Sequence, residues 1–161
     1  MKKIITTIVL LCTVAISFAQ TPIIKDFRSI IADRPNEFKN LQKELLKDNV
    51  EGGFKEYSST IKDLSFNRNL IMNGNRGAQY LVIFNLDAMN QETKNFFGLV
   101  SKQYFAEIDE MAKSGQYTVR NYTSNSGILI TEVNNLAGER ILEYRIKPNE
   151  HLVLFVGPKK Q

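Results

Sequence analysis

The chain has 161 residues, with 21 basic and 17 acidic side chains, one histidine and one cysteine. This length is typical of a single domain, and a formal net charge of +4 is too small for the strong field of a nucleic-acid-binding surface. One histidine and one cysteine are too few for the usual ligand set of a transition metal, so we expect neither a metal nor another cofactor.

The N-terminal residues follow the order of a cleavable secretory signal peptide, residues 1–19. A start with two lysines precedes a mostly apolar run, and small side chains at Ser17 and Ala19 occupy the positions that signal peptidase reads. The apolar run is about 13 residues, shorter than the roughly 20 that span a bilayer. We therefore expect cleavage between Ala19 and Gln20, export to the periplasm or the extracellular space, and no transmembrane segment in the product.

Cys12 raises an alternative for the same segment, because a lipoprotein carries its lipid on a cysteine that ends the targeting sequence. The residues before it, Val9, Leu10 and Leu11, include no small side chain, and apolar residues continue beyond it, so we favour the secretory signal. Cleavage removes the cysteine and two lysines, which lowers the net charge from +4 to +2 and leaves no disulfide.

Residues 20–34 form an N-terminal segment ahead of a single α+β domain over residues 35–161. The segment has no clear periodicity, but Phe27, Ile30 and Ile31 are too apolar for a solvated tail, so we expect it to dock on the domain. A domain of this length buries roughly two thirds of its unfolded surface, which is adequate without disulfides.

Residues 35–48 carry the signals of a first helix. Pro35 suits a first helical turn, and Phe38, Leu41 and Leu45 recur at spacings of three and four residues. A pair of glycines follows shortly afterwards, which marks the end of the helical segment.

From residue 54 the pattern changes from helical spacing to two-residue alternation. Residues 54–62 predict a strand, and residues 70–72 begin a hairpin whose turn includes Gly74 and Gly77. The partner strand, residues 80–84, is apolar on both alternating faces, so we expect it inside the sheet with both sides at least partly covered.

Residues 90–113 give the strongest helix signal, with an apolar stripe on one side and charged residues on the other. The stripe consists of Phe96, Phe97, Val100, Tyr104, Ile108 and Met111. Four further segments with short turns between them predict an antiparallel meander. They cover residues 117–123, 128–133, 139–147 and 152–156.

Together these elements predict an α+β fold with a mainly antiparallel sheet. We expect about seven strands, in the order helix, three strands, helix, four strands, with both helices packed on one face of the sheet. The order of elements alone also permits two similar halves side by side, although we favour a single sheet.

Four side chains of the meander form the candidate binding site. Arg120 and Tyr122 alternate onto one face of their strand, and Arg145 and Lys147 onto one face of another. If these faces coincide, guanidinium groups lie beside an aromatic ring on the uncovered side of the sheet, a surface able to hold carboxylates or an extended peptide. The alternative is the charged, solvated face that every one-sided sheet has.

Two other functions compete with binding. A small hydrolase would use His151, whose unperturbed pKa is near neutrality, next to a serine or a carboxylate, although no nucleophile motif accompanies it. A carrier of a hydrophobic ligand would line a pocket of roughly 300 Å³ or more with the stripe of the second helix. Core packing is the ordinary use of such a stripe.

The closing meander resembles that of small exported proteins of unknown function from Gram-negative bacteria. Residues 117–122, 138–144 and 152–157 carry the resemblance, which implies export and a lack of catalysis and identifies no site. Our leading hypothesis is therefore a non-catalytic domain of the periplasm or cell envelope that binds another protein, a peptide or an envelope component.

Overall fold

The computed structural model describes residues 22–64, 66–75 and 77–159. Two α-helices and eight strands confirm the predicted α+β class and its antiparallel sheet, with one strand more than expected. The helices are α2 (Pro22–Asp33) and α3 (Gln91–Lys113), and the strands are β1 (Gln42–Asn49), β2 (Phe54–Ser59), β3 (Asn67–Gly74), β4 (Gly77–Asn85), β5 (Tyr117–Thr123), β6 (Leu129–Asn135), β7 (Arg140–Ile146) and β8 (Glu150–Val156). The expected signal peptide, its cleavage site at Ala19 and Gln20, and Cys12 lie outside these residues.

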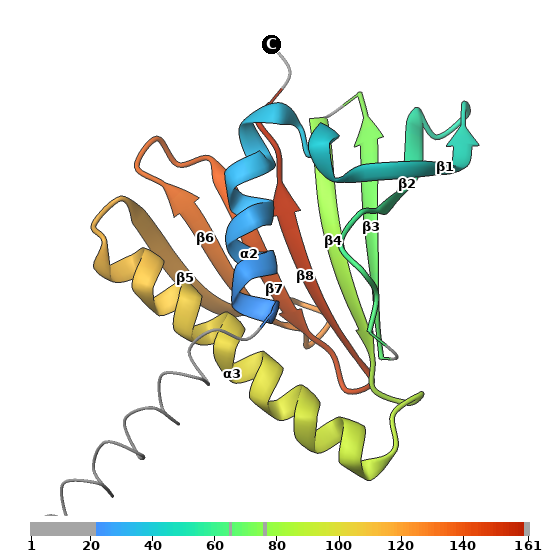
Figure 1. Ribbon diagram of the computed structural model, residues 1–161. Helices are drawn as coiled ribbons and strands as arrows, with labels where there is room; N and C mark the ends of the chain where they lie inside the picture. The colour runs from blue at the N-terminus through green and yellow to red at the C-terminus, as the bar shows by residue number, and fades with distance from the viewer. Residues whose placement is uncertain (1–21, 65, 76, 160–161) are drawn as a thin grey trace, which may run out of the picture.

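All eight strands pair antiparallel in one sheet, in the order β1-β2-β3-β4-β8-β7-β6-β5. Each half of the described chain contributes one helix followed by four consecutive strands, and the last strands of the two halves, β4 and β8, pair at the centre. The first strands, β1 and β5, therefore form the two edges. The single sheet that we favoured and the two similar halves that we left open are both present, because the halves join through β4 and β8 (Figure 1).

The first helix lies earlier in the chain than the sequence predicts, and the helix expected over residues 35–48 is wrong. The apolar N-terminal segment, expected only to dock, itself forms α2. Its Phe27 and Ile30 side chains are buried in the core. Residues 42–49, which end the expected helix, pair with β2 as strand β1 instead.

The chain turns sharply between α2 and β1. Glu37 and Phe38 have left-handed φ angles of 57° and 58°, which a regular α-helix of L-residues does not contain. They separate two short 3₁₀ turns, η1 (Arg34–Asn36) and η2 (Lys39–Leu41). Phe38 is fully buried whereas Leu45 is 52% exposed, so the helical spacing of these side chains does not mark one buried face.

Asp33 holds this turn in place. Its carboxylate accepts hydrogen bonds from the backbone N–H of Asn40 at 3.1 Å and from the side-chain amides of Asn36 and Asn40 at 3.2 and 2.6 Å. Asp33 is buried, and several donors offset the cost of removing a carboxylate from water. Core packing of Phe38 and this polar turn thus override the local helical pattern.

The predicted hairpin over residues 70–84 is confirmed. β3 and β4 pair residue by residue up to Gly74 and Gly77. Gly77 has a φ of 110°, a conformation that side-chain-bearing residues rarely adopt, so the turn requires glycine there. β4 lies between β3 and β8, inside the sheet as its apolar sequence predicts.

The predicted helix over residues 90–113 is confirmed as α3. Its N-terminus is capped by the Asn90 side chain, whose Oδ1 accepts hydrogen bonds from the backbone N–H and the hydroxyl of Thr93, both at 2.8 Å. Four stripe residues are buried: Phe97, Val100, Tyr104 and Ile108. Phe96, placed in the same stripe by the sequence, is exposed.

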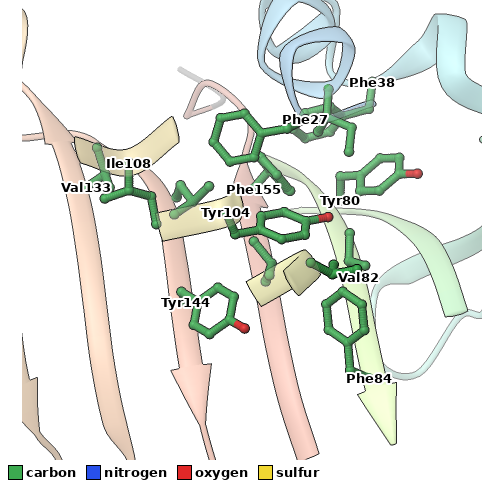
Figure 2. Close-up of a cluster of buried hydrophobic side chains, with 14 of the residues drawn as sticks. Phe27, Phe38, Tyr80, Val82, Phe84, Tyr104, Ile108, Val133, Tyr144 and Phe155 are labelled. Carbon is green, nitrogen blue, oxygen red and sulfur yellow. The ribbon is translucent and has the colours of Figure 1, made fainter. Parts of the chain in front are cut away.

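Aromatic side chains fill the space between the helices and one face of the sheet (Figure 2). Phe27 of α2 meets Tyr104 of α3 and Phe155 of β8 edge-on, at ring-centroid distances of 5.6 and 5.4 Å. Phe84 of β4 lies 5.0 Å from Phe97 of α3. Both helices lie on this side of the sheet (Figure 1), which confirms that they pack on one face.

Candidate functional site

The face of the sheet opposite the helices, called the open face below, carries a band of apolar side chains. Side chains alternate along a strand, so the residues between the core positions of β3, β4 and β8 point away from the helices. The register places Leu70, Leu81 and Leu154 in one row across these strands, and Ile83 and Leu152 in the next. These five side chains are the apolar band. Leu70 and Leu154 are buried by their neighbours although they lie outside the core cluster.

The described elements leave the apolar band without a covering layer. α2 and α3 pack against the other face, and β4 is apolar on both of its faces. An antiparallel sheet with one solvated face ordinarily alternates apolar and polar side chains. Both sides of residues 80–84 are at least partly covered, as expected: the helices bury one side, and on the other Leu81 and Ile83 are half-buried by neighbouring side chains with no described helix over them.

The structure brings Arg120, Tyr122 and Arg145 onto the open face. Tyr122 lies opposite Ile130 on β6, and Ile130 lies opposite Arg145 on β7. Arg120 is two residues from Tyr122 on the same strand and therefore shares its face. The two strand faces that the sequence left unconnected thus coincide, and whether these side chains bind a ligand stays a prediction.

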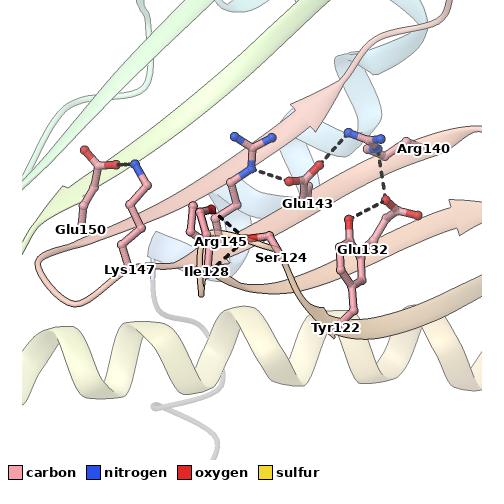
Figure 3. Close-up of polar contacts among 10 residues, drawn as sticks. Tyr122, Ser124, Ile128, Glu132, Arg140, Glu143, Arg145, Lys147 and Glu150 are labelled. Carbon is pink, nitrogen blue, oxygen red and sulfur yellow. Dashed lines mark hydrogen bonds and ion pairs between the residues drawn. The ribbon is translucent and has the colours of Figure 1, made fainter.

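Arg145 already holds a carboxylate from its own strand. The side chain of Glu143 is only 2% exposed and accepts hydrogen bonds from Arg145 Nε and, at 2.6 Å, from Arg140 Nη1 (Figure 3). A buried carboxylate with two guanidinium partners is stable because each donor compensates for lost water. The guanidinium group of Arg145 is consequently engaged within the protein, which leaves it less available to an outside carboxylate than the sequence predicts.

A second glutamate completes the arrangement. Glu132 on β6 lies directly opposite Glu143 on β7, and like charges in that position repel. Arg140 bridges the two, with its Nε 3.4 Å from Glu132, which also accepts hydrogen bonds from Tyr122 Oη at 3.3 Å and Asn134 Nδ2 at 2.8 Å. The four charges of Glu132, Arg140, Glu143 and Arg145, called the glutamate–arginine cluster below, cancel.

Glu132, Arg140 and Glu143 were not predicted as site residues from the sequence. Two-residue alternation indicates that Glu143 shares a face with Arg145, so the contact between these two residues could have been predicted from the sequence. Alternation assigns Arg140 to the opposite face. A register shift after Val133 changes its placement, because Val133 pairs with Leu142 while the next residue pairs with Arg140. Such a bulge re-aims a side chain and leaves no clear mark in the sequence.

Arg120 and Lys147 lie outside this cluster. The guanidinium carbon of Arg120 lies 5.9 Å from the ring centroid of Tyr122, in cation–π contact, and the side chain is exposed. Lys147 follows the end of β7 and donates a hydrogen bond to Glu150 at 2.7 Å. Among the described residues, Arg120 is the predicted site residue with a positive charge and no carboxylate partner.

His151 lies on the covered face, between β7 and α3. Its Nδ1 is 3.0 Å from Tyr144 Oη, which is 3.1 Å from Ser101 Oγ, and the ring of Phe97 stands edge-on at 4.9 Å. Burial lowers the pKa of His151 and raises that of Tyr144 to about 12. Ser101 reaches His151 only through the tyrosine, so this geometry gives no support to a serine hydrolase, which needs direct contact.

The hollows offer little to a hydrophobic ligand. A space of about 50 Å³ lies between the helices and β3 and β4, lined by apolar side chains together with Asp26, Lys62, Asn67 and Asn69. Ligand pockets measure about 300 Å³ or more. Two larger hollows, of about 510 and 410 Å³, flank the β1–β2 hairpin and are open to solvent. In the residues that the structure describes, no group of three or more histidine, cysteine, aspartate or glutamate side chains could hold a metal ion.

No protein-family model, no curated protein and no solved structure matches the chain. The geometry of the open face is therefore the basis for a proposed function.

Proposed function

We propose that the protein is an exported, non-catalytic binding domain of the periplasm or cell envelope, and that its open face receives another protein, a peptide or an envelope component. The observation that carries the proposal is the apolar band. Five leucine and isoleucine side chains on three adjacent strands have no described layer over them. Leu81, Ile83 and Leu152 are half-buried, so part of the band's apolar surface faces solvent, and apolar surface of this kind is typical of interaction sites.

Covering the apolar band supplies the driving force for association. Each 100 Å² of apolar surface removed from water contributes about 2.5 kcal/mol, before the cost of association is subtracted. The glutamate–arginine cluster borders the band on β6 and β7. Its charges are already paired, so a partner can contact the cluster without leaving a charge unpaired. An apolar centre with a polar border is the usual anatomy of an interface.

Site-specific photo-crosslinking in the cells that make the protein tests this proposal. A photoreactive amino acid in place of Ile83 lies in the apolar band, whereas one in place of Lys102 lies on the exposed side of α3 as a matched control. We expect a discrete adduct from position 83 and none from position 102, with the partner identified by mass spectrometry. Equal adducts at both positions, or none at position 83, would contradict the proposal.

A further inference from the structure

The two edge strands of the sheet differ in how they are protected. β5 pairs with β6 over seven consecutive residues without a register shift, and its sequence contains neither proline nor glycine. β1 pairs with β2 through two register shifts, and half of its residues are charged: Lys43, Glu44, Lys47 and Asp48. Irregular pairing and charge are the usual means by which a protein prevents another strand from adding to an edge. β5 lacks these protections, apart from the single charge of Arg120.

The backbone of β5 presents a regular set of donors and acceptors to its outer side. The backbone N–H of Ser124 donates to the carbonyl of Ile128 at 2.9 Å, next to the last residue pair of β5 and β6. Antiparallel pairs alternate between hydrogen-bonded and non-hydrogen-bonded positions. The amides of Arg120 and Tyr122 therefore face β6, whereas those of Val119 and Asn121 face outward, together with those of Tyr117 and Thr123. A strand is the ligand that such an edge fits.

Arg120 determines what kind of strand fits best. It lies at the middle of β5, and its neighbour across the sheet, Glu132, is already engaged by Arg140, Tyr122 and Asn134. A second copy of β5 that overlaps it fully would place two Arg120 side chains directly opposite each other, a destabilising arrangement. A strand with a carboxylate at that position keeps every backbone hydrogen bond and neutralises the charge.

We propose that the outer edge of β5 takes up an extended segment of another protein, with an acidic side chain opposite Arg120, as a ninth strand of the sheet. This inference rests on the proposed function, because it names the partner's chemistry and the edge at which the partner enters. Arg120 and Tyr122 belong to both the open face and this edge, so alternate side chains of a strand added at β5 extend the open face.

The experiment uses two blocked nine-residue peptides of alternating threonine and valine, one with glutamate and one with lysine at its centre. Titration followed by NMR on the purified protein gives their affinities, and amide hydrogen exchange gives their location. We expect the glutamate peptide to bind about fivefold more tightly, because an opposite charge replaces a like charge across the strands. Bound peptide should slow exchange at Val119 and Asn121, with little change at Arg120 and Tyr122.

A charge reversal separates strand addition from unspecific contact. In Arg120→Glu the preference should invert, with the lysine peptide binding about fivefold more tightly, whereas Lys47→Glu on the β1 edge should leave the wild-type preference unchanged. Arg120 and Lys47 are both exposed, and each variant places a glutamate opposite another one, Glu132 or Glu56, so the two variants are matched in local repulsion and circular dichroism checks that both fold. Unchanged exchange at Val119 and Asn121, equal affinities for the two peptides, or self-association through β5 would overturn the inference. Adducts at position 83 without any protection of β5 would overturn it while leaving the proposed function standing.

Discussion

The two faces of the sheet use apolar side chains in different ways. On the covered face, aromatic rings from β4 and β8 interlock with rings from α2 and α3, and Phe155 and Tyr80 are fully buried. On the open face, the apolar band has neighbours along the sheet and none above it among the described residues. One set of strands thus builds a packed core on one side and, on the other, an apolar face that no described helix covers.

A matched pair of leucines should show the largest difference between the faces. Leu142 on the covered face is fully buried, and Leu154 on the open face is 6% exposed. Leu142→Ala should lower the free energy of unfolding by about 3–4 kcal/mol because it leaves an enclosed cavity, whereas Leu154→Ala should lower it by about 1–2 kcal/mol. Urea unfolding at constant m-value measures both. Equal losses would contradict the claim that the open face lacks a packed layer.

The glutamate–arginine cluster should give an intermediate effect. Glu143→Ala removes a buried carboxylate and leaves Arg140 and Arg145 without their shared partner, so we expect a loss of about 2 kcal/mol, limited by the partial exposure of both arginines. Glu150→Ala breaks an exposed pair with Lys147 and should cost less than about 0.5 kcal/mol. Thermal unfolding of the two variants under one buffer condition measures the difference. Similar losses would mean that burial on the open face adds nothing to this cluster.

The smallest expected effect is a pH dependence on the covered face. Burial holds the pKa of His151 below its ordinary value of 6.5, so the unfolded state binds a proton more readily than the folded state. The contribution of His151 to stability is therefore complete above about pH 6.5 and decreases as the pH falls below that value. Unfolding free energies at pH 5 and pH 8 should differ less in His151→Gln than in the wild type. A larger difference in the variant would contradict this account.

Elements with strong local signals were predicted well from the sequence. α3 begins one residue after its Asn90 cap, and β5 matches the expected bounds of residues 117–123. The turns between the later strands are short, so strands that are neighbours in sequence pair with each other. The N-terminal half was harder, because Phe38 and Leu45 repeat the spacing of a helix although one is buried and the other exposed.

The candidate site was predicted only in part. Alternation correctly placed Arg120 and Tyr122 on the same face of β5, and Arg145 and Tyr144 on opposite faces of β7. Alternation did not predict the glutamate that neutralises Arg145. In the sequence, a glutamate that will be buried in a strand cannot be distinguished from an ordinary polar residue until its arginine neighbours are placed in space. The bulge that brings Arg140 to the open face depends on how β6 and β7 pair.

The sequence by itself determined the class of fold, the long helix and the closing meander, because helix caps, apolar stripes and turn residues act within a few positions along the chain. Only the tertiary structure decided that β4 and β8 join the two halves, that α2 replaces the expected helix, and that one face of the sheet stays open. These outcomes depend on contacts between residues far apart in the chain, and local periodicity does not specify which surfaces meet.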